Sequence, residues 1–192
     1  MMPRTLSNTL SLALLAAICC APAAAQAPSP WQATVHVGML EVDRLVRDDG
    51  AWWTRVDDRK TAPGLSFIYD VTPMVGVRAM YERADDLDAR NVCPPGATCP
   101  AVAIRGRGDF SAWQLAAMPR YRLSRDWALF GTLGAMYWEL DRDKVLPGDS
   151  GTEFVYGAGV SWRASRRVEL GLEYQHAGVD FDALRLNAGM RF

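Results

Sequence analysis

The strongest constraint on the fold is a period-two alternation that runs along Val168–Phe192 and breaks only briefly at residues 177–182. One face of this pattern is mostly apolar: Val168, Leu170, Leu172, Tyr174, His176, Leu184, Leu186, Ala188, Met190 and Phe192. The other face holds charged and polar residues and glycines: Glu169, Gly171, Glu173, Gln175, Arg185, Asn187, Gly189 and Arg191. Such alternation predicts strands with one apolar and one polar face. We expect lipid against the apolar face and a packed, charged interior.

Six earlier segments follow similar patterns and raise the number of predicted strands to eight. They are Trp31–Asp43, Gly64–Thr72, Met74–Arg83, Phe110–Leu123, Trp127–Leu140 and Thr152–Arg163. The fifth is apolar on both faces, so its inward and outward residues are not assigned. An even number of antiparallel strands closes into a barrel without free edges, as lipid requires. The predicted fold is all-β, an eight-stranded antiparallel up-and-down transmembrane β-barrel over residues 31–192.

The connections and the aromatic residues support this architecture. Long connections, at about 45–63, 84–109, 141–151 and 177–182, alternate with short turns, as in barrels with tight periplasmic turns and longer external loops. Tracing the strands places two groups of aromatic residues at opposite ends, as in the girdles at membrane–water interfaces. The expected periplasmic group is Trp31, Tyr121, Trp127, Trp162 and Phe192. The expected external group is Tyr81, Trp113, Tyr137, Tyr156 and Tyr174.

Residues 1–25 have the features of a secretory signal peptide. Arg4 supplies the positive charge, Leu10–Cys20 the apolar segment and Ala23–Ala25 a small-residue cleavage site. Cleavage after Ala25 is favoured over Ala27, because Pro28 would follow the latter. A lipoprotein signal ending at Cys19 or Cys20 is the alternative, although neither cysteine follows the small residue that such a signal needs. Residues 26–30 would then form a short N-terminal segment of an exported protein.

Export to an oxidising compartment would leave two cysteines, Cys93 and Cys99, in the segment CPPGATCP. An even pair in such a turn-rich segment predicts a disulfide that closes a small loop. The sequence offers no second pair or nearby histidine for a metal site. From residue 26 onward the chain has 20 basic and 22 acidic residues, a net charge of −2. This balance gives no basic footprint for nucleic acid.

The chain resembles the small outer-membrane β-barrel superfamily, in particular the OmpA-like transmembrane domain group. The resemblance rests on the segments 156–163 (YGAGVSWR), Val168–Tyr174 and Leu186–Phe192, and it covers the chain from about Trp31 onward. The last segment, with Leu186, Ala188, Gly189, Met190 and Phe192, resembles the signal that the outer-membrane assembly machinery recognises. The resemblance implies an outer-membrane location. No peptidoglycan-binding domain follows Phe192 here, so we do not expect a tethering role.

An eight-stranded barrel is just wide enough inside for its own side chains. The charged residues predicted to face inward are therefore expected to form a network of ion pairs: Arg78, Glu82, Arg120, Arg163, Glu169, Glu173, Arg185 and Arg191. We expect Glu169 and Glu173 to bridge to arginines of neighbouring strands, because an unpaired buried ion costs roughly several kcal/mol. Opening of such bridges would give a narrow channel, whereas a satisfied network gives a closed lumen.

Catalysis is not expected, because no recognisable motif joins the two histidines, His36 and His176, to a serine or an acid. A rim-sited lipid-modifying enzyme is the alternative. No cofactor or metal is predicted. Function is expected in the external loops, where Trp52 and Trp53 are candidates for contact with lipopolysaccharide, a host surface or another protein. The alternative is that both tryptophans fold back onto the barrel rim as part of the aromatic girdle. The sequence thus predicts a monomeric structural or surface-interaction protein in outer-membrane lipid, with a narrow channel as the alternative.

Overall fold

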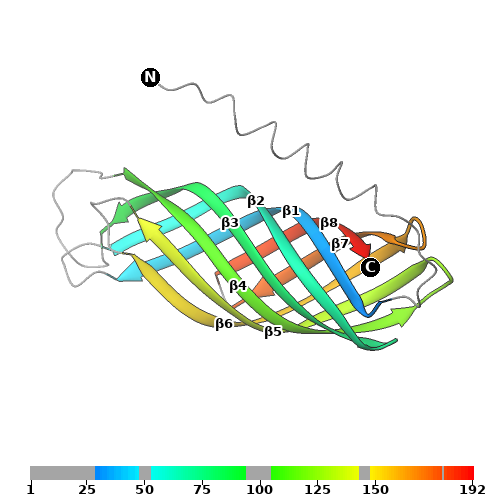
Figure 1. Ribbon diagram of the computed structural model, residues 1–192. Coiled ribbons are helices and arrows are strands. Elements are labelled where there is room, and N and C mark those ends of the chain that lie inside the picture. The colour runs from blue at the N-terminus through cyan, green and yellow to red at the C-terminus, as the bar shows by residue number, and fades with distance from the viewer. Residues whose placement is uncertain (1–28, 48–52, 94–104, 143–147, 179) are drawn as a thin grey trace, which may run out of the picture.

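The computed structural model describes residues 29–47, 53–93, 105–142, 148–178 and 180–192. It forms one closed barrel in which each strand pairs antiparallel with the next in sequence (Figure 1). The strands are β1 (Trp31–Arg47), β2 (Trp53–Thr72), β3 (Val75–Val92), β4 (Arg105–Arg122), β5 (Trp127–Arg142), β6 (Asp149–Arg163), β7 (Val168–Ala177) and β8 (Phe181–Arg191). Pairing of β1 with β8, from Gln32 opposite Arg191 to Val42 opposite Phe181, closes the sheet. The predicted fold class is confirmed.

The first six strands are longer than the sequence pattern predicted. β2 has 20 residues and β3 has 18, whereas roughly 9–11 residues cross a bilayer as a tilted strand. Most of the expected first loop, 45–63, and much of the second, 84–109, belongs to these strands. The prediction of long loops there was wrong, because the extra strand residues are charged on the outside. In Figure 1 the strands continue to the left-hand end of the barrel.

The three turns at the opposite end, which we expect on the periplasmic side, form the same type of hydrogen bonds. Thr72, Ser124 and Ser165 each accept two backbone N–H bonds with the side-chain hydroxyl, at 3.0 to 3.3 Å. Hydroxyl side chains form such turns by replacing a backbone acceptor. These turns hold β2 to β3, β4 to β5 and β6 to β7 with short connections, as the sequence predicted.

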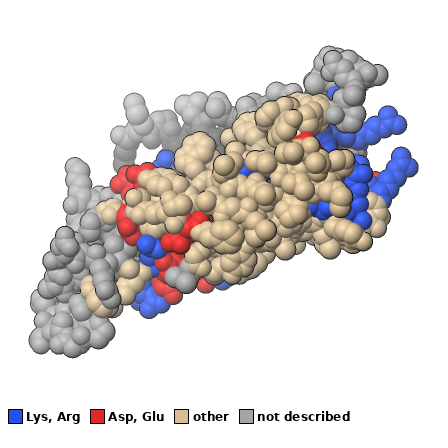
Figure 2. Space-filling view, turned by 90° about the horizontal axis from the view of Figure 1, so that it is seen from below, with Lys and Arg blue, Asp and Glu red and all other residues tan. Residues whose placement is uncertain are grey.

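The alternation of β5, which the sequence left open, is resolved by burial. Phe130, Thr132 and Met136 point into the lumen, while Leu129, Leu133 and Tyr137 are exposed on the outside. The outer wall at mid-height is apolar around the barrel and appears as the tan belt of Figure 2. The aromatic residues of the two expected girdles lie on the outer surface, where they form pairs such as Trp127–Trp162 and Tyr81–Trp113. No helix in the described parts of the chain is long and apolar enough to span a membrane.

One glycine makes room for a lumen side chain. Gly64 lies opposite His36 in the β1–β2 ladder, and a Cβ at this position would approach the imidazole Nε2 to 2.2 Å. The absence of a side chain at Gly64 therefore lets the His36 ring lie flat against β2 inside the barrel.

Candidate functional site

Two bidentate ion pairs cross the middle of the lumen. Arg78 of β3 donates to the two carboxylate oxygens of Glu173 on β7 at 2.7 and 2.9 Å. Arg185 of β8 donates to both oxygens of Glu82 on β3 at 2.6 and 2.9 Å. All four side chains are at most 4% exposed. Bidentate, charge-assisted bonds of this kind are among the strongest that side chains form.

Neutral side chains join the two pairs into one network. Thr132 and Gln175 donate hydrogen bonds to Glu173 at 2.7 and 2.8 Å, and the Gln175 oxygen accepts a short bond from Arg185. His36 lies beside the other pair, with its Nε2 3.8 Å from Glu82 Oε2. The two arginines balance the two glutamates in charge, and the network crosses the lumen from β3 to β7 and β8. We call it the central ion-pair layer.

The partner of Glu173 differs from the expectation. Its arginine, Arg78, lies on β3 and not on a neighbouring strand, so the bridge spans the barrel. The interior of an eight-stranded barrel is narrow enough for one arginine to reach the far wall. Glu169 does face a neighbouring strand, where Arg191 Nη2 lies 3.6 Å from its carboxylate.

A second set of charges lines the periplasmic mouth. Asp70 accepts a hydrogen bond from Arg120 at 2.5 Å, and its other oxygen lies 3.0 Å from Arg191 Nη1, so one carboxylate serves two guanidinium groups. Arg163 forms no ion pair with any residue that the structure describes. Asp70 was not among the predicted network residues, although its inward position on β2 was readable from the alternation. The other members of the predicted network are placed on the lumen side of their strands.

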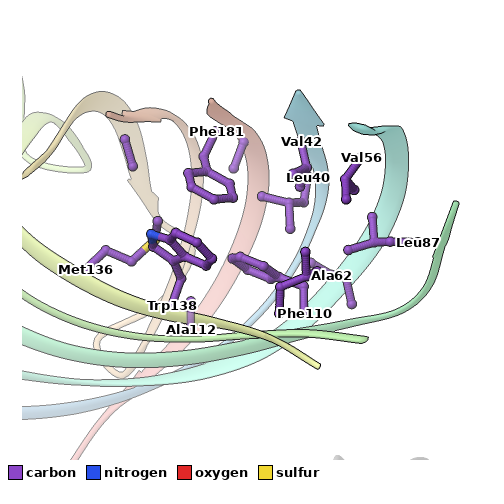
Figure 3. Packing of buried hydrophobic residues seen from close by; sticks show 14 of the residues in the cluster. Leu40, Val42, Val56, Ala62, Leu87, Phe110, Ala112, Met136, Trp138 and Phe181 are labelled. Atoms are coloured by element: carbon purple, nitrogen blue, oxygen red, sulfur yellow. The ribbon is translucent and has the colours of Figure 1, made fainter. Parts of the chain in front are cut away.

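The extracellular half of the lumen is apolar, and this corrects the expectation of a polar interior throughout. Its buried cluster consists of Leu40, Val42, Val56, Ala62, Ala84, Leu87, Ala89, Phe110, Ala112, Met136, Trp138, Leu140, Val155, Ala177, Phe181 and Ala183. Trp138 and Phe110 are fully buried, and both rings pack against Phe181 with centroids 5.3 and 5.5 Å apart (Figure 3). We call this cluster the upper core. Continued inward alternation at Leu40 and Val42 was the signal that could have revealed it.

Arg44 covers the upper core at its extracellular end. Its guanidinium lies 4.3 Å from the centroid of the Trp138 ring. It also bonds Asp149 at 3.0 Å and Asp180 at 2.6 Å, with Glu153 at 3.8 Å. A cation over an indole face is attracted by the ring quadrupole. Arg44 thus joins the ends of β1, β5 and β6 across the top of the barrel.

The outer wall around the upper core is charged. Cross-strand ion pairs connect Arg55 to Asp43 at 2.9 Å and Arg83 to Asp109 at 3.0 Å, and Arg59 to Glu41 at shorter range. Figure 2 shows acidic and basic side chains mixed at one end of the molecule. The polarity of the barrel therefore reverses along its axis. The membrane part is apolar outside and mostly polar inside, apart from a small cluster of Ile68, Met118 and Phe130, whereas this part is charged outside and apolar inside. We call it the extracellular extension.

The predicted loop residues fall partly within the structure. Trp53 does not lie in a loop but begins β2, opposite Arg47 and Val92; Trp52 lies outside the described residues. Cys93 is disulfide-bonded at the end of β3. Its predicted partner, Cys99, also lies outside the described residues, so the pairing stays a prediction. The C-terminal segment forms β8, with Leu186 and Phe192 exposed on the outer face.

The histidines do not share a site. His36 is buried in the lumen, whereas His176 lies on the outside of β7, where its Nδ1 is 2.9 Å from Asp182 Oδ1. The hydroxyl of Tyr174 donates to the same oxygen at 2.5 Å. Among the residues that the structure describes, no cluster of three metal-ligating side chains is present.

The fold and the layered lumen define a small outer-membrane barrel, and a family comparison identifies it. The model of the outer membrane protein beta-barrel domain matches residues 10–192, and the chain belongs to this family. It is an outer-membrane protein. Outer membrane protein A of Klebsiella aerogenes is 27% identical over 110 residues, which are 56% of this chain. The chain spans only 29% of the length of that relative.

Solved structures show the same fold at low identity. Ail, the attachment invasion locus protein of Yersinia pestis, is 20% identical with a TM-score of 0.52, covering 84% of this chain and 98% of Ail. Neisserial surface protein A is 12% identical with a TM-score of 0.54, covering 86% and 98%. OprG from Pseudomonas aeruginosa is 11% identical with a TM-score of 0.59, covering 86% and 97%. These structures share the architecture with this chain.

Proposed function

We propose that the protein is a non-conducting outer-membrane barrel that presents its extracellular extension and loops as an interaction surface. The observation that carries this proposal is the upper core. Opening of the central ion pairs alone would leave Trp138, Phe110 and Phe181 filling the lumen above them. A path for solutes would require the loss of a packed apolar cluster, which is far more costly than a rotamer change.

The extension and the segments between its strands offer an acidic surface for recognition. Over residues 40–63, 83–112, 136–155 and 176–184 the sequence has 11 basic and 17 acidic residues, a balance of −6. Ail has been crystallised with the heparin analogue sucrose octasulfate, a polyanion. The acidic balance here disfavours a polyanion and favours a partner with a basic surface, because complementary charge guides association. Contact with lipopolysaccharide phosphates at this height would need bridging divalent cations.

The other parts of the proposal follow from the same architecture. The apolar belt contacts outer-membrane lipid, and we propose that the β8 segment ending in Phe192 is read by the assembly machinery. We propose a monomer, because the outer wall is apolar at membrane height and charged above it, as a single barrel requires. We also propose that the protein is not an enzyme; His176→Ala would then leave the lipid A of expressing cells unchanged in mass.

Planar-bilayer recording of the purified protein, combined with loop variants, tests the proposal. We expect no steady openings from the wild-type barrel. Shortening residues 48–52, 94–104 and 143–147 in turn should abolish a surface phenotype, such as adhesion, without preventing barrel insertion. The matched control keeps all three segments at full length and carries the substitution Ser111→Ala on the outer wall. Steady conductance, or solute uptake that depends on the protein, would favour the narrow channel and contradict the proposal.

A further inference from the structure

The periplasmic mouth of the barrel is a cavity of about 290 Å³ that the proposed function does not use. Its walls come from β2, β4, β5, β6, β7 and β8, from the turns after β2 and β4, and from residues 29–30 before β1. Arginines dominate the lining: Arg120, Arg122, Arg125, Arg163 and Arg191. The acids are Asp70, Asp126 and Glu169, which leaves the cavity with a balance of +2. A cavity of this size accommodates a small ligand.

The acids neutralise only the deepest arginines. Arg120 and Arg191 share Asp70, and Arg191 also approaches Glu169 at 3.6 Å. The Nε atom of Arg191 is buried and has no hydrogen-bond partner within the described structure. Arg122, Arg125 and Arg163 also line the cavity, and they form no ion pair with any residue that the structure describes. The guanidinium groups of Arg122 on β4, Arg163 on β6 and Arg125 in the turn after β4 thus line one space without an ion-pair partner among the described residues, beside the unpartnered Nε of Arg191 on β8.

This arrangement contrasts with the rest of the molecule. The central ion-pair layer balances two arginines with two glutamates, and the extension carries an excess of acid. The rim turn adds Arg166 and Arg167 beside the mouth, so positive charge concentrates at this one end (Figure 2). Like charges held close together in a cleft with low-dielectric walls repel one another and focus a positive potential. An anion in the cavity would relieve that repulsion.

We propose that the periplasmic mouth binds a compact anion that carries a phosphate group. Planar guanidinium forks match the oxygens of phosphate, and several of them around one cavity provide more donors than a single carboxylate accepts. The phosphate has two possible sources. It is either a small phosphate ester in the periplasm or the headgroup of an anionic phospholipid in the inner leaflet, whose surface lies at the level of Trp127 and Trp162.

Nuclear magnetic resonance of the ¹⁵N-labelled full barrel tests the site. In one arm, the protein in a neutral detergent is titrated with inorganic phosphate, with glycerol phosphate and with succinate. In the other arm, it is placed in phosphatidylcholine nanodiscs with or without phosphatidylglycerol. The readout is the amide shifts of residues 124–127 and 164–167. The variant is Arg122→Gln/Arg163→Gln, and the control with the same charge change is Arg83→Gln/Arg107→Gln at the extracellular end.

Saturable shifts with phosphate or glycerol phosphate, at least tenfold weaker in the mouth variant and unchanged in the control, would support the site and a soluble source. Shifts that occur only with phosphatidylglycerol, and show the same dependence on the variants, would support the site and a lipid source. The proposal is overturned if neither arm gives saturable shifts, if all three proteins respond equally, or if succinate binds as tightly as the phosphates. Far-ultraviolet circular dichroism and heat-modifiable gel mobility establish that both variants are folded.

Discussion

Removal of one member of an ion pair has different consequences in the lumen and on the outer wall. Glu173 is fully buried beside Arg78, so Glu173→Ala would leave a buried guanidinium without its counter-charge. We expect this variant to lose about 3–5 kcal/mol of unfolding free energy. Urea titration in micelles, followed by tryptophan fluorescence, measures the loss.

Two controls separate charge from packing. The double variant Arg78→Met/Glu173→Leu removes both charges with similar volume, and we expect it to recover most of the stability. Arg55→Ala, which breaks an exposed pair with Asp43, should leave the unfolding free energy nearly unchanged. If Glu173→Ala alone has the same unfolding free energy as the wild type, the central ion-pair layer does not stabilise the barrel.

Asp58 provides a pH-dependent contribution in the extracellular extension. Its Oδ2 accepts the backbone N–H of Asp88 at 2.8 Å, across the irregular part of the β2–β3 ladder, and lies 3.2 Å from Lys60 Nζ. Burial alone would raise the pKa of Asp58. The hydrogen bonds from Asp88, Lys60 and Arg59 outweigh it, so the pKa lies below its ordinary range.

Because the folded-state pKa of Asp58 is lowered, its contribution is present above the unfolded-state value of about 3.9 and disappears as pH falls through the folded-state value. We expect Asp58→Ala to cost about 1–2 kcal/mol at pH 7 and to cost little near pH 2. Unfolding titrations at both pH values measure this. Asp57→Ala, at an exposed neighbouring position, is the control. A loss that is the same at both pH values would contradict the assignment.

The alternation of single residues predicts which charges face the lumen but not which of them pair. Glu82, Glu173 and Arg185 were assigned inward from their parity along the strand. Their partners depend on the stagger of strands around the barrel, which brings β3 opposite β7 and β8. Stagger is a property of the closed sheet and is not encoded in any one strand.

At the scale of the strand, the sequence predicted the membrane half well and the extracellular half poorly. On β1 the inward residues change from Gln32 and Thr34 to Leu40 and Val42, while the outward residues change from Val35 and Val37 to Glu41 and Asp43. The pattern keeps its period and exchanges its polarity. The predicted strands end where the outward residues stop being apolar. The charged continuation of each strand is therefore predicted as a loop.

Trp138 is the largest fully buried side chain of the upper core, so its truncation tests whether the extension is held from within. We expect Trp138→Ala to lower the unfolding free energy by about 3–5 kcal/mol through lost burial and the resulting cavity. Denaturant titration in micelles is the measurement. Tyr137→Ala, whose side chain faces outward on the same strand, should cost much less. Equal losses for both variants would contradict a packed core at this level.

At the scale of the whole molecule, the lumen is closed by two different plugs in series. We expect Arg78→Ala/Glu173→Ala to remain non-conducting in planar bilayers, because the upper core still fills the extracellular half. Adding Glu82→Ala/Arg185→Ala, which removes the second ion pair, together with Trp138→Ala and Phe110→Ala should produce openings. The converse double variant, Trp138→Ala/Phe110→Ala with intact ion pairs, should stay closed. Conductance from the ion-pair variant alone would show that the upper core does not seal the barrel.

The exchange of polarity along the strands also fixes where the membrane–water interface lies on the outer wall of the barrel. The outer wall changes from apolar to charged at Glu41, Arg59 and Arg83. Along a strand tilted by about 45°, a step of two residues changes the height by about 5 Å. Replacing those three residues with leucine extends the apolar belt toward the extracellular extension. The extension should therefore sink into the bilayer by about that distance. A few charged residues on the outer wall thus determine how deeply the molecule inserts. Substitutions at these positions should change that depth in steps of two strand residues.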